Sequence, residues 1–80
     1  MEITKEVLER VADRVRYLLY LRDMTQTDLA NKSNSTQANV SLILNKKKTD
    51  IKLSTLVSFA EAFDVDIKVL FMEKNPVDIN

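Results

Sequence analysis

The sequence contains no cysteine and no histidine among its 80 residues. Without cysteine there is no disulfide, no thiolate metal ligand and no thiol nucleophile. Without histidine, imidazole-based catalysis and histidine-ligated metal centres are excluded as well. The carboxylates are scattered among lysines and arginines, and no nucleophile paired with a general base stands out. We therefore expect a protein that is not an enzyme and holds no metal or other cofactor.

Glycine is also absent, and Pro76 is the single proline. A glycine-rich phosphate-binding loop cannot exist in such a chain. The same two shortages favour an almost wholly helical fold, because glycine and proline are the poorest helix formers. No apolar run approaches the ~18 residues of a membrane helix, and the N-terminus lacks the apolar core of a signal peptide. We expect a soluble, cytoplasmic protein that does not enter a membrane.

The net charge is zero, but the charges are unevenly distributed along the chain. Residues 1–23 are balanced, residues 24–52 carry a net charge of +3, and residues 53–80 carry −3. The positive segment includes the run Lys46-Lys47-Lys48. Taken alone, such a run is typical of a solvated surface loop. Next to a helix that reads DNA, it would instead lie near phosphates.

Apolar residues at steps of three and four predict a long first helix from about Thr4 to Arg22. We expect its charged residues, among them Arg14 and Arg16, on the opposite, solvated face. Tyr17 and Tyr20 fall outside the apolar stripe, where they would either pack over helix ends or form a partner surface. The buried stripe is formed by Val7, Leu8, Val11, Ala12, Val15, Leu18 and Leu19.

Two further helices are predicted towards the C-terminus, over residues 53–63 and 67–72. Asp64 is expected to end the first of them, and Asp66 to cap the start of the second. Residues 1–72 then form one domain. The tail, residues 73–80, contains Pro76, and we expect it to be disordered; if ordered, it is a candidate dimer contact.

Between these helices, two short helices are predicted on either side of a polar turn at residues 33–35. Thr25 and Thr36 are suitable N-cap residues, and Asp28 stands where a capping box needs an acid. The second short helix has a narrow apolar stripe, and four of its residues face outward. An amide, two small side chains and an apolar tip suit the base edges in a major groove. These four residues are Gln37, Ala38, Ser41 and Leu42.

The pattern Thr25-Gln26-x-x-Leu29-Ala30, followed by Thr36-Gln37-Ala38-Asn39-Val40-Ser41 and by Ile43 and Asn45, resembles the helix-turn-helix family of phage repressors and Cro proteins. The resemblance extends over residues 18–71. It implies a compact, five-helix, all-α, lambda-repressor-like domain whose second short helix lies in the major groove.

The resemblance also implies a role for individual residues. Gln26 matches the residue that contacts a phosphate and braces the first glutamine of the recognition helix, here Gln37. The implied base contacts are Gln37, Ala38, Ser41 and Leu42. The implied contacts to the DNA backbone are Gln26, Thr36, Asn39, Asn45, Lys46 and Lys47.

Three positions depart from the family pattern. Asn34 in the turn, and Asn45-Lys46 after the recognition helix, stand where the family favours glycine, which adopts positive φ without cost. Asparagine tolerates that conformation better than other residues do. The polar residue Ser35 replaces the family's apolar residue after the turn.

The resulting hypothesis is a transcriptional regulator, most simply a repressor, that binds a pseudo-palindromic operator in double-stranded DNA as a homodimer. Two alternatives remain. The chain would also suit the antitoxin of a toxin–antitoxin pair, holding a toxin with its first helix or its tail. The run Leu42-Ile43-Leu44 and the neutral charge would also fit a protein-interaction module that has lost DNA binding.

Overall fold

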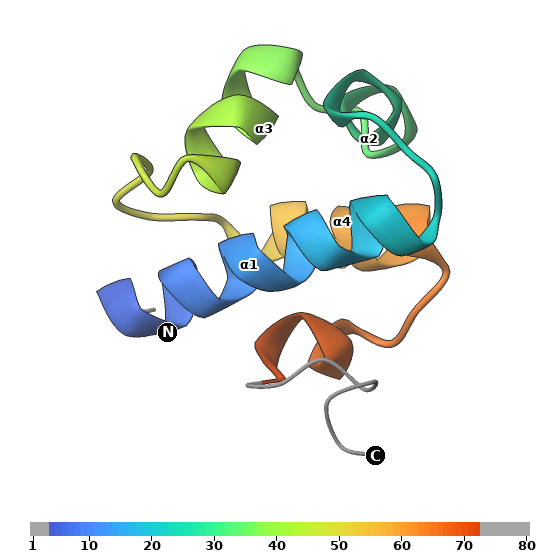
Figure 1. Ribbon diagram of the computed structural model, residues 1–80. Coiled ribbons are helices and arrows are strands. Elements are labelled where there is room, and N and C mark those ends of the chain that lie inside the picture. The colour runs from blue at the N-terminus through green and yellow to red at the C-terminus, as the bar shows by residue number, and fades with distance from the viewer. Residues whose placement is uncertain (1–3, 73–80) are drawn as a thin grey trace.

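The computed structural model describes residues 4–72, which form four α-helices and one short 3-10 helix (Figure 1). In this range there is no β-strand, so the predicted all-α class is confirmed. None of the helices there is long and apolar enough to cross a membrane. The predicted tail, residues 73–80, lies outside the described residues. The elements are α1 (Lys5–Leu21), α2 (Gln26–Lys32), α3 (Gln37–Leu44), α4 (Leu53–Phe63) and η1 (Ile67–Phe71).

The predicted fifth α-helix is wrong in type, because η1 is a 3-10 helix of five residues. The N–H of Val69 donates to the carbonyl of Asp66 three residues earlier, at 3.0 Å. The Asp66 carboxylate itself accepts from the N–H of Lys68, also at 3.0 Å. After Phe71 the backbone is already extended at Met72. So short a segment favours the tighter 3-10 form, since few of its residues can form bonds of the α type.

The helices are arranged around α1, which crosses the middle of the molecule (Figure 1). The α2–α3 pair lies on one side of α1 and η1 lies on the other. α1 contacts both α3 and η1, whereas α4 contacts α2 and η1. The α2–α3 pair is therefore supported by both long helices, and its outer side is left free of the other described elements.

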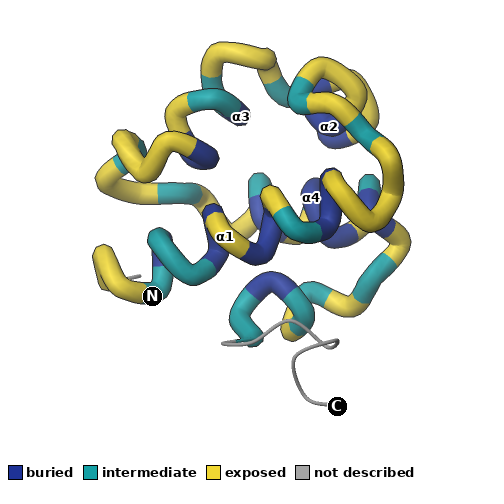
Figure 2. Tube along the Cα trace, in the orientation of Figure 1, coloured by how far each residue is buried: buried dark blue, intermediate teal, exposed yellow. Residues whose placement is uncertain are grey.

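The core lies between these helices, and Figure 2 shows the buried parts of the trace turned inward. The predicted stripe of α1 is buried except Val7, which is half-buried against the core. In the run Leu42-Ile43-Leu44, Leu44 is only 1% exposed and belongs to the core, whereas Leu42 is 43% exposed. The core residues of the other elements are Leu29, Ala30, Val40, Ile43, Leu44, Leu56, Phe59, Ala60, Phe63 and Leu70.

Every α-helix is followed by a residue with positive φ, although the chain has no glycine. After α3 this residue is Lys46, whose N–H donates to the carbonyl of Ile43, while the N–H of Lys47 donates to that of Leu42. This pair of bonds is the Schellman motif, which satisfies carbonyls at a helix end. The four residues, with φ between 53° and 61°, are Asp23, Asn34, Lys46 and Asp64.

Three arginines from α1 and its C-cap donate to carbonyls at the C-terminal ends of other elements. Arg16 reaches the carbonyl of Leu44, Arg22 reaches that of Phe63, and Arg14 reaches that of Met72. A cation at the end of a helix offsets the negative end of its dipole and binds carbonyls that lack a partner. These three bonds tie α1 to the ends of α3, α4 and η1.

The prediction that Arg14 lies on a solvated face is wrong, since the residue is 2% exposed. Its guanidinium lies over the ring of Tyr17, with its central carbon 5.5 Å from the ring centroid. The two tyrosines of α1 thus differ, because Tyr17 is half-buried and contacts Arg14, whereas Tyr20 is 81% exposed.

Candidate nucleic-acid interface

The start of α2 is fixed by a reciprocal pair of hydrogen bonds. The Thr25 hydroxyl accepts from the N–H of Asp28 at 3.0 Å, and the Asp28 carboxylate accepts from the N–H of Thr25 at 2.9 Å. The predicted capping box is therefore confirmed. The backbone N–H of Thr25 lowers the pKa of Asp28, with further help from the Thr25 hydroxyl and from Lys32.

The turn between α2 and α3 is held by polar side chains. The Ser33 hydroxyl donates to the carbonyl of Leu29 at 2.6 Å, and Asn34 has a φ of 56°. Ser35, the polar replacement in the family pattern, accepts from the Asn39 side-chain amide at 3.1 Å. The turn is thereby joined to the first turn of α3, and the Asn39 amide is partly engaged within the domain.

α3 begins at the predicted cap, where the Thr36 hydroxyl accepts from the N–H of Asn39 at 3.1 Å. On its inner face, Val40, Ile43 and Leu44 are at most 2% exposed. Its front end is open to solvent, as the exposed colouring of this part of the trace shows (Figure 2). Gln37, Ala38 and Leu42 are exposed there, and Ser41 is half-buried.

Gln26 lies at the first position of α2 and is half-buried. Within residues 4–72, the side-chain amides of Gln26 and Gln37 make no hydrogen bond, so they are not joined in the free domain. A hydrogen bond by which Gln26 supports Gln37 stays a prediction for the complex with DNA. Both side chains keep their donors and acceptors for a ligand.

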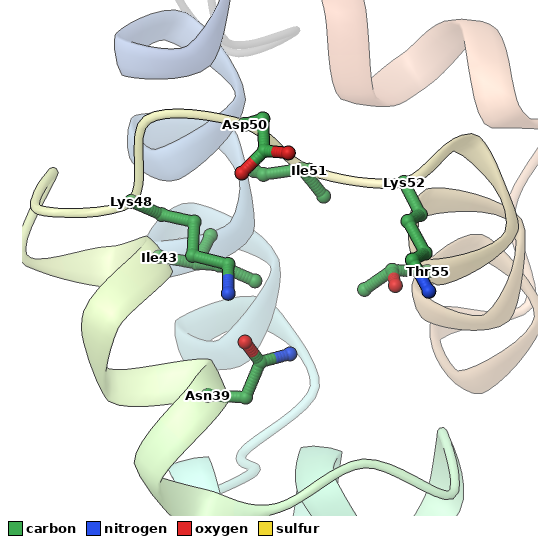
Figure 3. Close-up of a pocket in the computed structure, with 7 residues that line it drawn as sticks. All are labelled: Asn39, Ile43, Lys48, Asp50, Ile51, Lys52 and Thr55. Carbon is green, nitrogen blue, oxygen red and sulfur yellow. The ribbon is translucent and has the colours of Figure 1, made fainter.

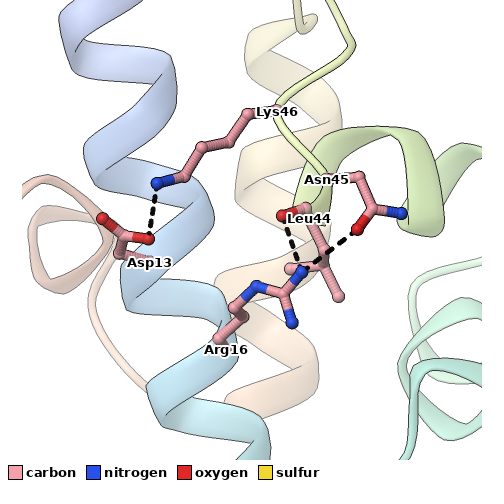
Figure 4. Close-up of polar contacts among 5 residues, drawn as sticks. All are labelled: Asp13, Arg16, Leu44, Asn45 and Lys46. Atoms are coloured by element: carbon pink, nitrogen blue, oxygen red, sulfur yellow. Dashed lines mark hydrogen bonds and ion pairs between the residues drawn. The ribbon is translucent and has the colours of Figure 1, made fainter.

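The rear end of α3 is tied to α1 by Asp13 and Arg16, for which the sequence predicted no functional role (Figure 4). Arg16 donates to the Asn45 side-chain oxygen at 3.3 Å, and Asn45 donates to the Ser41 hydroxyl at 3.1 Å. Lys46 forms an ion pair with Asp13, with 3.0 Å between the Lys46 Nζ and a carboxylate oxygen. Asp13 and Arg16 are three residues apart on α1, a spacing that indicates only that they share a face.

Beyond α3, a hollow of about 280 Å³ opens between this helix, the following loop and the start of α4 (Figure 3). Lys48 and Lys52 stand at its sides, and the Asp50 carboxylate beside them reduces the local positive charge. Asn39 and Thr55 add hydrogen-bonding groups to the lining. Lys52 and Thr55 were not predicted as functional residues, and their spacing gives no signal of their position beside α3.

The described residues offer no cluster of three acidic side chains that is placed to hold a metal ion. What they do offer is an exposed helix end with amide, hydroxyl and apolar groups. The lysines of the loop that follows α3 lie at the other, C-terminal end of this helix.

A family model of the Cro/C1-type helix-turn-helix DNA-binding domain matches residues 14–71, from the middle of α1 to the end of η1. The chain belongs to this family. Within the match lie all the predicted contact residues, from Gln26 to Lys47. The resemblance that the sequence indicated is therefore confirmed, and this Cro/C1-type domain is of the DNA-binding helix-turn-helix class.

Two solved structures have the same fold as this Cro/C1-type domain. The restriction-modification controller protein C.AhdI from Aeromonas hydrophila is 23% identical, with a TM-score of 0.75, over 80% of this chain and 96% of that one. The hypothetical transcription factor NHTF from Neisseria is 20% identical, with a TM-score of 0.80, over 99% of this chain and 88% of that one. Comparison with curated proteins gave no match.

Proposed function

We propose that this Cro/C1-type domain is a cytoplasmic transcriptional regulator that binds a specific sequence in double-stranded DNA and acts as a repressor by occluding a promoter. The observation that carries this proposal is the division of α3 into two faces. Its inner residues are fully packed, whereas Gln37 and Ala38 at its front end are exposed. A front end covered by the protein's own chain would have ruled out entry into a groove.

In the proposed complex, the front of α3 lies in the major groove. Gln37 pairs with the edge of an adenine, and Leu42 covers a thymine methyl group. Ala38 and Ser41 complete the surface that faces the bases. Around them, the DNA backbone is bound by Gln26, Thr36, Asn39, Asn45, Lys46 and Lys47.

The lysines contribute unequally to the proposed phosphate contacts. Lys46 is paired with Asp13 in the free domain, so its charge is partly neutralised before DNA arrives. Lys47 is exposed and has no partner within the described residues. Lys47 therefore contributes more to sequence-independent affinity than Lys46 does.

A homodimer follows from the geometry of operator binding. One domain carries a single recognition helix, which covers only a few base pairs. Dimers of helix-turn-helix domains place two such helices about 34 Å apart, in successive major grooves on one side of the duplex. We therefore propose a pseudo-palindromic operator whose two half-sites are bound by residues 1–72 of two chains.

The test is selection of bound sequences from a random duplex pool at two salt concentrations. We expect a two-fold symmetric consensus, with half-sites about one helical turn apart, and weaker binding at the higher salt. Enrichment of no sequence, together with salt-insensitive or absent binding, would overturn the proposal and favour an interaction module of the same fold.

One feature of α1 favours a second candidate function. The chain would be an antitoxin that binds DNA through the same recognition helix and also binds a toxin. Tyr20 is 81% exposed and Leu21 beside it is 46% exposed, so the two side chains offer adjacent apolar surface to a protein partner. A gene for a small toxin next to the gene for this chain would support it. Loss of toxin binding in a Tyr20→Ser variant, with DNA binding retained, would locate the toxin on α1.

A further inference from the structure

We infer that Arg16, on α1, is a positioning residue that determines which base edge Ser41 reads, because it fixes the orientation of the Asn45 amide between them. This inference rests on the proposed function, since it concerns the specificity of the same recognition helix. None of the predicted roles included Arg16, and its side chain lies behind α3, on the side of α1 (Figure 4).

Arg16 is attached to the end of α3 by two hydrogen bonds. One terminal nitrogen of its guanidinium donates to the Leu44 carbonyl at 2.9 Å and to the Asn45 side-chain oxygen at 3.3 Å. A guanidinium nitrogen of this type carries two hydrogens, so both bonds can form at once. The Leu44 carbonyl belongs to the last residue of α3 and has no partner within the helix.

The contact with Arg16 fixes the orientation of the Asn45 amide. Because its oxygen accepts from Arg16, its nitrogen points the other way and donates to the Ser41 hydroxyl oxygen at 3.1 Å. An amide has nearly the same shape in its two orientations, so only its hydrogen-bond partners distinguish them. Arg16 has no acceptor atom, and it therefore selects the orientation with the oxygen towards α1.

The orientation of the Asn45 amide leaves the hydrogen of the Ser41 hydroxyl available to DNA. A serine hydroxyl has one hydrogen to donate, and here its oxygen already accepts from Asn45. Within residues 4–72 the hydroxyl donates to no acceptor. Ser41 thus presents a donor to the groove. It should favour base edges that accept there, which are purine N7, guanine O6 and thymine O4, over the amino group of cytosine.

Without Arg16, the Asn45 amide is free to turn over. Its oxygen would then accept the Ser41 hydrogen, and the hydroxyl would present lone pairs to the groove instead of a hydrogen. The preference of Ser41 for an accepting base edge would be lost. A simple change in charge would not have this effect, because it lowers the affinity for all sequences alike.

The experiment measures the affinity of the full chain for four duplexes that differ only at the base pair next to Ser41. That pair is identified as the one whose preference disappears in a Ser41→Ala variant. For the wild type we expect roughly a 2- to 10-fold preference for the accepting edges, as one hydrogen bond allows. In Arg16→Ala this preference should disappear, while the preferences at other base pairs remain.

Two further variants strengthen the test. In Asn45→Asp the carboxylate still accepts from Arg16 but has no hydrogen to donate, so it accepts from Ser41. We expect the preference at this base pair to shift towards cytosine, whatever the loss of overall affinity. The matched control is Arg22→Ala, which removes the equivalent bond to the end of α4. It should leave the base profile unchanged.

Coupling between the two positions gives a second readout. Once Ser41 is alanine, the further change Arg16→Ala should leave the profile of the four duplexes as it was, because both act through one hydroxyl. Suppose that the wild type binds selectively, but that Arg16→Ala keeps the full preference or weakens binding to all four duplexes equally. That result would overturn this inference alone. A wild type without any sequence preference would overturn the proposed function as well.

Discussion

At the scale of single residues, the positive-φ positions are the most unusual feature of this chain. An L-residue in this conformation costs about 1–2 kcal/mol, less for Asp and Asn, and glycine is normally used to avoid the cost. The resemblance drew attention to Asn34 and Asn45-Lys46, and the structure places the positive φ at Asn34 and Lys46. Asp64 was predicted as a helix end, whereas Asp23 was not, because no local pattern marks it.

Asp64→Gly is expected to stabilise the domain by roughly 0.5–1 kcal/mol, which is the relief of the left-handed backbone less the greater chain entropy of glycine. Urea unfolding monitored by circular dichroism measures the change. Asp66→Gly is the matched control, since Asp66 has a φ of −68° and its side chain caps η1. The control should lose a few tenths of a kcal/mol. Equal shifts in both variants would contradict the explanation.

A second prediction at this scale concerns Asp28. Its pKa is lowered in the folded domain, chiefly by the N–H of Thr25, so the ionised form contributes stability above the unfolded-state pKa of about 4. This contribution is lost as the pH falls through the lower folded-state pKa. Asp28→Asn should therefore be less stable than the wild type at pH 7. Unfolding free energies measured down to pH 2 should converge, and a constant difference would contradict the assignment.

At the scale of elements, local patterns predicted the helices well. The stripe of α1, the threonine caps of α2 and α3 and the apolar face of α4 each depend on neighbours within a few residues. The exposure of Gln37 and Ala38 at the front of α3 was predicted because it follows from the spacing of the apolar residues within the same helix. The burial of Arg14 was not, because its carbonyl partner at Met72 lies 58 residues away. The contacts of Asp13 and Arg16 on α1 with Lys46 and Asn45 were not predicted either, because these partners also lie far apart in the sequence.

α3 itself supplies the next prediction, through the exposed amide at its first position. Gln37→Ala should cost roughly 1–3 kcal/mol of binding free energy on the operator and relax specificity at one base pair. Binding titrations on operator duplexes with all four pairs at that position give the measurement. Equal losses on the operator and on random DNA would show that Gln37 does not read a base.

The loop after α3 has a different expected signature. Lys47→Ala should weaken binding to all sequences alike and reduce the slope of log affinity against log salt by about one unit. Lys68→Ala on η1 is the matched control, since η1 lies on the opposite side of α1 from α3. A sequence-dependent loss from Lys47→Ala, or an equal change of slope in the control, would contradict the backbone role.

At the scale of the whole molecule, size and charge both bear on how DNA is bound. The domain measures 35 × 28 × 20 Å, so its longest dimension is close to the rise of one turn of duplex. The net charge of the whole chain is zero, with the positive excess in residues 24–52, which include the α2–α3 pair. We therefore expect non-specific attraction to act mainly on one side of the molecule, and the affinity of the proposed dimer to come largely from the simultaneous use of two half-sites.

Insertion of base pairs between the half-sites tests this dependence on two chains. Five extra pairs rotate one half-site by about half a turn, and ten restore the rotation but add about 34 Å of separation. A rigid dimer of domains of this size can bridge neither, so both insertions should lower the affinity, by roughly 10-fold or more. Binding titrations on the three duplexes provide the comparison. A domain that acts as a monomer would bind all three equally, because each half-site is intact, and equal affinities would therefore exclude the dimer while leaving base reading by α3 unaffected.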